Sequence, residues 1–122
     1  NGFVTRETVA SFAKRVSDEA EAGNQILEKL IRTGAATLVA NVSAVARRLG
    51  FEGDFVVSGV GGVFRGLVFE RSFRSELETR IPQARFREPV FGPATGSLLL
   101  AYRFAKIELS EHLLSNLKRD KV

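Results

Sequence analysis

Apolar residues recur three or four positions apart over five stretches of the chain, the spacing that gathers them on one face of a helix. We therefore predict helices over about residues 5–22, 24–50, 67–80, 93–106 and from 110 onward. Thr5, Asn24 and Ser110 can cap the first, second and last of these helices, because their side chains accept hydrogen bonds from free helix N–H groups. Gly23 and Gly50 are suited to end the first two.

Two short runs between these helices are predicted as strands. The first covers about 54–60 and is rich in valine, and the second covers about 84–90, near a sheet edge because Pro89 cannot donate to a ladder. The order is thus α-α-β-α-β-α-α, in which a β-α-β crossover would be parallel and right-handed. Two strands make a poor sheet, so we expect the remaining strands to come from chain outside this sequence or from a partner.

The length predicts one domain over residues 1–122, and the order of elements makes it α/β. No apolar run approaches the ~20 residues that span a bilayer, and no basic segment followed by an apolar one opens the chain. Cysteine is absent, which excludes disulfides, thiolate catalysis and cysteine-bound iron–sulfur clusters in these residues. The cytoplasm fits this composition best. Because methionine is also absent and the chain begins at Asn1, we expect a piece of a longer protein.

The net charge of +4 is mild, and basic residues are dispersed among acidic ones, as over 71–80. Nucleic-acid binding usually needs a concentrated basic face. We therefore expect neither a nucleic-acid nor a membrane partner.

Residues 54–67 carry the strongest chemical signal. A strand runs into Gly59, Gly61 and Gly62, and an amphipathic helix follows. Glycines there let the main chain approach a phosphate or ribose and permit positive φ, and the following helix can direct its N–H groups at an anion. The spacing matches neither a Walker A motif nor GxGxxG, and a tight turn would need the same glycines for geometry alone. Both interpretations stay open on spacing.

Other polar residues give weaker signals. His112 has no partner for a metal site or a triad, and Ser58 lacks the GxSxG elbow. Asp54 precedes its strand, whereas ligands of open α/β sheets lie at the carboxyl ends. Arg65 could meet a phosphate or be an ordinary surface arginine. We predict no catalytic residue and no metal ligand in this chain.

Two segments carry a resemblance to a known family. Residues 55–64 (Phe-Val-Val-Ser-Gly-Val-Gly-Gly-Val-Phe) resemble the strand–Gly-Gly-Val-Phe signature of the BadF/BadG/BcrA/BcrD ATPase and N-acetylglucosamine kinase family. Residues 93–101 resemble that family's closing helix, and the long helix before Gly50 stands where the family has one. The resemblance covers about 5–106. It implies the carboxyl-terminal part of a ribonuclease H-like lobe of an actin-like ATPase, with ATP between two lobes.

The same resemblance implies which residues would contact ATP. Gly61 and Gly62 would form the adenosine-side loop near the ribose and α-phosphate, and Val63 and Phe64 would begin the helix-side wall of the pocket. The family's phosphate loops and catalytic aspartate belong to earlier strands and have no match here. The cysteines of its dehydratase activators are also missing, which favours the sugar-kinase branch.

We therefore expect the adenine-nucleotide-binding portion of an ATP-dependent sugar kinase, similar to N-acetylglucosamine kinase, or of a BadF-type ATPase. ATP, Mg²⁺ and a small-molecule sugar would bind only together with the missing amino-terminal lobe, and this chain alone would be inactive. The alternative is a non-catalytic helical interaction or regulatory domain, favoured by the long helix rich in small residues and the shortage of strands. A homodimer is left open.

Overall fold

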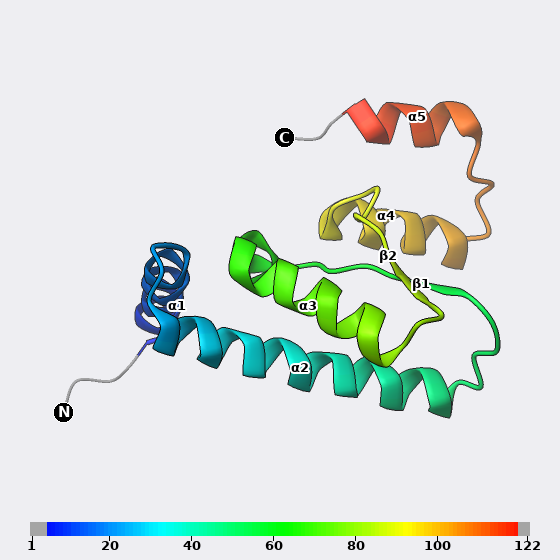
Figure 1. Ribbon diagram of the computed structural model, residues 1–122. Coiled ribbons are helices and arrows are strands. Elements are labelled where there is room, and N and C mark those ends of the chain that lie inside the picture. Colours follow the sequence, from blue (N-terminus) through cyan, green and yellow to red (C-terminus); the bar gives the residue numbers. More distant parts are fainter. Residues whose placement is uncertain (1–4, 120–122) are drawn as a thin grey trace. The chain divides into compact units, whose positions relative to one another are not determined.

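The computed structural model describes residues 5–119, which form an α/β fold (Figure 1). The elements are α1 (Arg6–Glu21), α2 (Gln25–Arg48), β1 (Phe55–Val57), the 3₁₀ turn η1 (Gly62–Arg65), α3 (Leu67–Arg80), β2 (Ala84–Phe86), α4 (Pro93–Phe104) and α5 (Glu111–Arg119). The predicted order of helices and strands is confirmed, with η1 added. The chain divides into two compact units. The first runs to Val57 and resumes over Gly61–Arg87, and the second comprises Ser58–Val60 and the chain from Glu88 on.

The predicted capping residues define the helix ends. Thr5 Oγ1 accepts a hydrogen bond from the N–H three residues on, at 3.2 Å, and Asn24 Oδ1 accepts two, at 3.2 and 3.3 Å. Gly23 and Gly50 follow α1 and α2 with φ of 99° and 66°, a left-handed conformation that glycine adopts without steric cost. Ser110 Oγ accepts from the N–H three residues on at the start of α5, at 3.2 Å.

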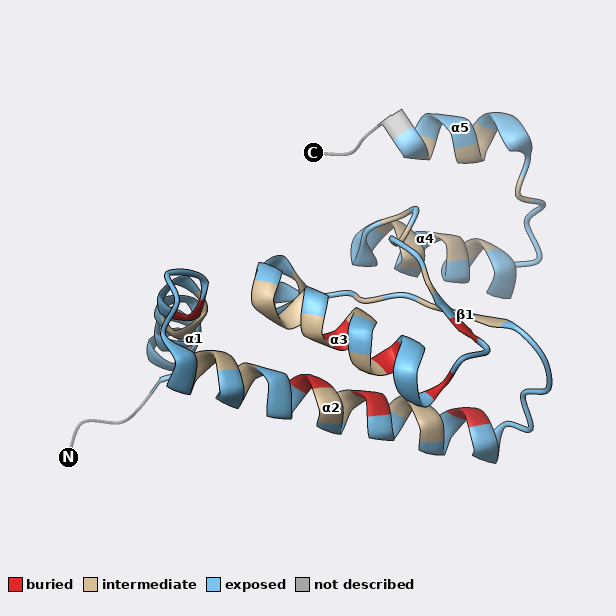
Figure 2. Ribbon diagram, in the orientation of Figure 1, coloured by how far each residue is buried: buried red, intermediate tan, exposed pale blue. Residues whose placement is uncertain are grey.

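The core of the first unit lies between α2 and α3. Phe73 and Leu77 are four residues apart on α3, and both are fully buried against Ala35 and Val39 of α2 (Figure 2). Ile81 extends the same face of α3. The small Ala35 side chain lets the two helices approach closely, and the larger buried side chains of Val39, Phe73 and Leu77 fill the space between them. The predicted apolar face of α3 is therefore confirmed.

The two strands pair in parallel, with Val56 opposite Arg85. Phe55 and Val57 pack against the core, whereas Val56 and Arg85 are exposed, as the period of two requires. Both strands are shorter than the predicted 54–60 and 84–90. That prediction was wrong at the carboxyl ends, because glycines follow β1 and a proline follows β2, and these residues favour leaving the ladder.

The second unit contains α4 and α5. Pro93 occupies the first turn of α4 as predicted, because its missing N–H would have no partner there. The helix ends before the predicted Lys106, which has a φ of 56°. The N–H groups of Lys106 and Ile107 donate back to Arg103 and Tyr102 at 3.1 and 2.9 Å, and these bonds close the helix end.

Candidate functional site

Gly61 has a backbone conformation that only glycine adopts readily. Its φ and ψ are 113° and 173°, in a region that other residues occupy at a cost of about 1–3 kcal/mol. Gly61 directly precedes η1, and its carbonyl accepts the Phe64 N–H at 3.3 Å. Among residues 5–119, neither Gly59 nor Gly62 has a positive φ. Of the three glycines expected to permit a positive φ after the strand, Gly61 is the one that adopts it.

The turn formed by Gly61, Gly62 and Val63 presents main chain to solvent. All three residues are exposed, and a Cβ added at either glycine would meet no atom within 4 Å. No hydrogen bond within residues 5–119 uses the N–H of Gly62 or Val63. Two free donors on uncovered backbone can bind a hydroxyl or an anionic oxygen.

Phe64 points away from this exposed surface and anchors the turn. Its ring lies in a cluster with three other phenylalanines, with ring centroids 5.4 Å from Phe69, 5.2 Å from Phe73 and 6.1 Å from Phe86. These distances are those of favourable aromatic pairs. The ring therefore fixes the turn to the core, and its place in a ligand-binding wall stays a prediction.

The first N–H of α3 does not face open solvent. The Leu67 N–H donates to Glu21 Oε1 of α1 at 2.9 Å. A carboxylate is favoured there because the amino end of a helix carries partial positive charge. The Leu67 N–H therefore has a partner within the chain and is not free to meet a ligand anion. The position of Glu21 at the end of α1 marks it as an acid that its own helix disfavours, but nothing in the sequence names Leu67 as its partner.

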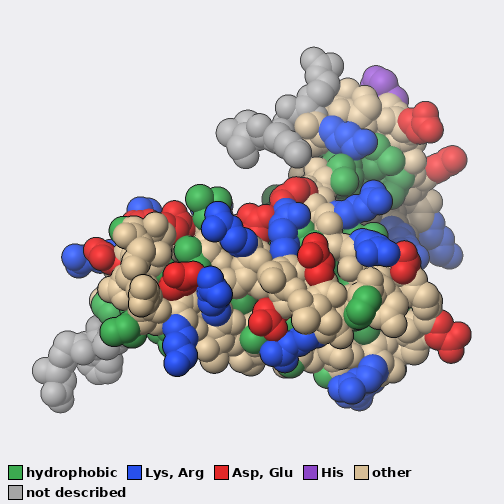
Figure 3. Space-filling model, viewed as in Figure 1, with side chains coloured by type: hydrophobic (Ala, Val, Ile, Leu, Met, Phe, Trp, Pro, Cys, Tyr) green, Lys and Arg blue, Asp and Glu red, His purple; other side chains and the backbone are tan. Residues whose placement is uncertain are grey.

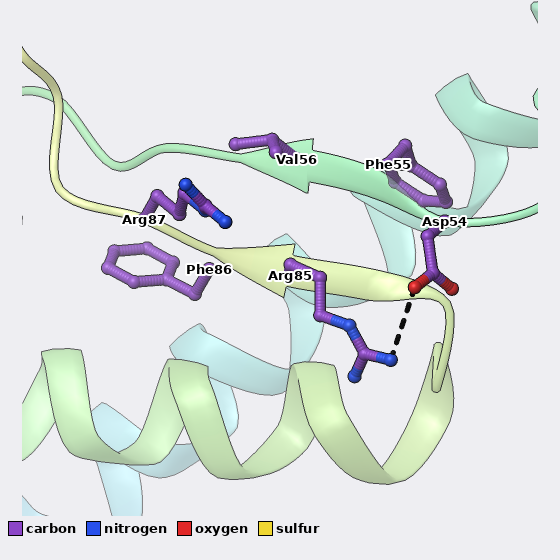
Figure 4. Close-up of a pocket in the computed structure, with 6 residues that line it drawn as sticks. All are labelled: Asp54, Phe55, Val56, Arg85, Phe86 and Arg87. Carbon is purple, nitrogen blue, oxygen red and sulfur yellow. Dashed lines mark hydrogen bonds and ion pairs between the residues drawn. The ribbon is translucent and has the colours of Figure 1, made fainter.

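An open hollow of about 470 Å³ lies along the two strands, lined by Asp54, Phe55, Val56, Arg85, Phe86 and Arg87 (Figure 4). Arg85 reaches Asp54 across the amino end of the sheet, with Nη2 and Oδ2 3.3 Å apart. Both side chains are more than half exposed, at 60% and 67%. The hollow therefore holds a surface ion pair. Asp54 lies at the amino end of β1, as predicted, away from the end where ligands of parallel sheets bind.

The remaining polar candidates are exposed. Ser58, Arg65 and His112 all lie at the surface, and the His112 ring has Asn116 as a neighbour at 3.5 Å. On the face shown in Figure 3, basic and acidic side chains are interspersed over α2 and α3. Pairs four residues apart account for this, as between Arg80 and Glu76 at 2.7 Å.

Two further features are absent from residues 5–119. These residues contain no group of three His, Cys, Asp or Glu side chains that could hold a metal ion. Within the same range, no helix is long and apolar enough to cross a membrane.

A parallel β-α-β unit with an uncovered glycine turn after its first strand is typical of α/β proteins that bind ligands at the carboxyl ends of strands. The model of the BadF/BadG/BcrA/BcrD ATPase family matches residues 2–101, and the chain belongs to this family. The resemblance noted in the sequence is thereby confirmed. At the level of the family, this gives the chain an ATPase, nucleotide-binding role. No curated protein and no solved structure matches it.

Proposed function

We propose that the intact protein is an ATP-dependent sugar kinase, or an ATPase of the BadF type, in which the Gly61–Phe64 turn forms part of the adenosine side of the nucleotide pocket. The observation that carries the proposal is the uncovered main chain of Gly61 and Gly62, which lie between β1 and α3. Membership of an ATPase family supports a nucleotide as the ligand of this backbone.

The residues of the turn suit the ribose and α-phosphate of ATP. The free N–H groups of Gly62 and Val63 can donate to a ribose hydroxyl or a phosphate oxygen. The absence of a Cβ at Gly61 and Gly62 leaves room for close approach. Val63 is 51% exposed and can lie against the apolar face of a nucleoside, while the Phe64 ring holds the turn to the core. ATP with Mg²⁺ supplies the phosphoryl group that is transferred.

The rest of the site would come from the amino-terminal lobe of the same protein. We assign this chain to the carboxyl-terminal part of the second lobe, and the phosphate loops, the catalytic aspartate and the sugar-binding residues to the missing lobe. The incomplete sheet supports the assignment. The sheet has two strands, and its outer face, with Val56 and Arg85, is exposed in the first unit, although parallel sheets are normally covered on both faces. The absence of cysteine favours a kinase similar to N-acetylglucosamine kinase over a dehydratase activator.

The test is ATP binding by the full-length protein carrying Gly62→Val. Gly62 has no positive φ, and the space around it is open, so the substitution leaves the fold intact and places two methyl groups where the nucleotide would approach. We expect the Kd for ATP to rise at least about tenfold, which corresponds to about 1.4 kcal/mol. Gly34→Val is the matched control, because Gly34 is an equally uncovered glycine on α2. An unchanged Kd for Gly62→Val would refute the adenosine-side assignment and favour the interaction-domain alternative.

A further inference from the structure

Glu21 links the end of α1 to the start of α3, two points 46 residues apart in the sequence. Its Oε1 accepts the Leu67 N–H at 2.9 Å and also lies 3.4 Å from Ser17 Oγ, which donates to it from one turn earlier on α1. The carboxylate thus satisfies a backbone donor that the helix itself cannot satisfy. No side chain of the α3 segment supplies this cap, because Gly66 precedes the helix.

Gly66 is a second, independent indication that α1 packs closely against the start of α3. Its φ of −80° is open to any residue, so its conformation does not require glycine. A Cβ at Gly66 would, however, collide with Ser17 Oγ. The glycine therefore serves the close approach of α1, and any larger residue would displace the hydroxyl that hydrogen-bonds to Glu21.

This link also determines where the glycine turn lies. The segment that joins the turn to α3 ends at Gly66, whose N–H donates to the Val63 carbonyl at 3.4 Å. Its fixed points are the Phe64 ring in the aromatic cluster and the Leu67 N–H on Glu21. Without the hydrogen bond from the Leu67 N–H to Glu21, only the packing of α3 would hold the carboxyl end of the segment between Gly61 and Leu67.

We propose that Glu21 is a positioning residue for nucleotide binding: by capping α3 it holds the N–H groups of Gly62 and Val63 in one arrangement. The inference rests on the function proposed above and goes beyond it, because Glu21 lies on another helix and acts through Leu67. A pre-arranged turn binds its ligand more tightly, since less conformational entropy is lost on binding.

The experiment compares Glu21→Ala, Glu21→Gln and Glu19→Ala in the full-length protein. Glu19 is the matched control, because it is an exposed glutamate on the same helix without a side-chain partner among residues 5–119. Hydrogen exchange at the Leu67 amide and the NMR order parameters of the Gly62 and Val63 amides are measured without nucleotide, and the Kd for ATP and the Tm are measured for each variant.

We expect Glu21→Ala to speed exchange at the Leu67 amide, to lower the order parameters of Gly62 and Val63, and to raise the Kd for ATP about three- to tenfold, whereas Glu19→Ala matches the wild type. Glu21→Gln keeps a neutral acceptor, so it should retain most of the affinity. The Kd is measured well below the Tm of every variant, where a purely structural role, which acts through global unfolding, would leave it unchanged. Gly66→Ala, which displaces the Ser17 hydroxyl, should shift exchange at Leu67 in the same direction.

Two results overturn the inference: unchanged exchange at Leu67 in Glu21→Ala, or faster exchange with unchanged ATP affinity. The Gly62→Val variant separates the two proposals. If Gly62→Val weakens ATP binding and Glu21→Ala does not, the positioning role alone fails. If Gly62→Val has no effect, the nucleotide-binding role of the turn fails, and the positioning role fails with it.

Discussion

Replacing Gly61 or Gly62 by alanine separates backbone strain from steric crowding at the turn. A Cβ meets no atom within 4 Å at either position, so crowding is the same for both variants. The backbone differs: Gly61 has a φ of 113° and a ψ of 173°, whereas Gly62 has no positive φ. Gly61→Ala should therefore lower the free energy of unfolding by about 1–3 kcal/mol. Gly62→Ala should change it little, or raise it by about 0.4–1 kcal/mol, because alanine reduces the conformational freedom of the unfolded chain.

The assay is urea unfolding followed by circular dichroism, with the midpoint and the m-value fitted for the wild type and both variants. We expect a lower midpoint for Gly61→Ala at an unchanged m-value, and a midpoint equal to or above that of the wild type for Gly62→Ala. Equal midpoints for the two variants, or a greater loss at Gly62, would refute the assignment of the strained conformation to Gly61.

Three further substitutions test the fold by the same unfolding assay. Phe73→Ala should cost about 3–5 kcal/mol, because the ring is 1% exposed and its removal leaves a cavity between α2 and α3; a loss below about 1 kcal/mol would contradict this core. Asn24→Ala should cost about 1 kcal/mol by removing the cap of α2, and an unchanged midpoint would argue against that cap. Asp54→Asn should change stability by at most about 0.5 kcal/mol, because its ion pair with Arg85 is solvated; a larger loss would show that the hollow is more closed than described.

Local signals made the helices predictable. Capping side chains such as Asn24 and left-handed glycines such as Gly50 act within a few residues of the helix end, so they can be read directly from the sequence. The two strands were predicted too long, because strand length depends on a partner strand elsewhere in the chain. β1 keeps three paired residues, although the apolar run continues to Val60.

The sequence predicted only that part of the site that depends on residue type, namely a backbone turn rich in glycine. Three glycines after a strand indicated a backbone turn, but the sequence could not tell which glycine adopts the positive φ that the structure gives to Gly61. The cap that Glu21 gives to Leu67 joins residues far apart in the sequence, so no local pattern predicts their pairing. The direction of the Phe64 ring likewise depends on packing against Phe73 and Phe86, which is settled only by the tertiary fold.

The central claim is that the backbone of Gly62 and Val63 contacts ATP. It is tested most directly by following the amide resonances of the isotopically labelled full-length protein during titration with ATP. We expect saturable shifts at the Gly62 and Val63 amides, with one Kd that matches the value measured by calorimetry. Saturable shifts elsewhere in the protein, with both amides unmoved, would contradict it.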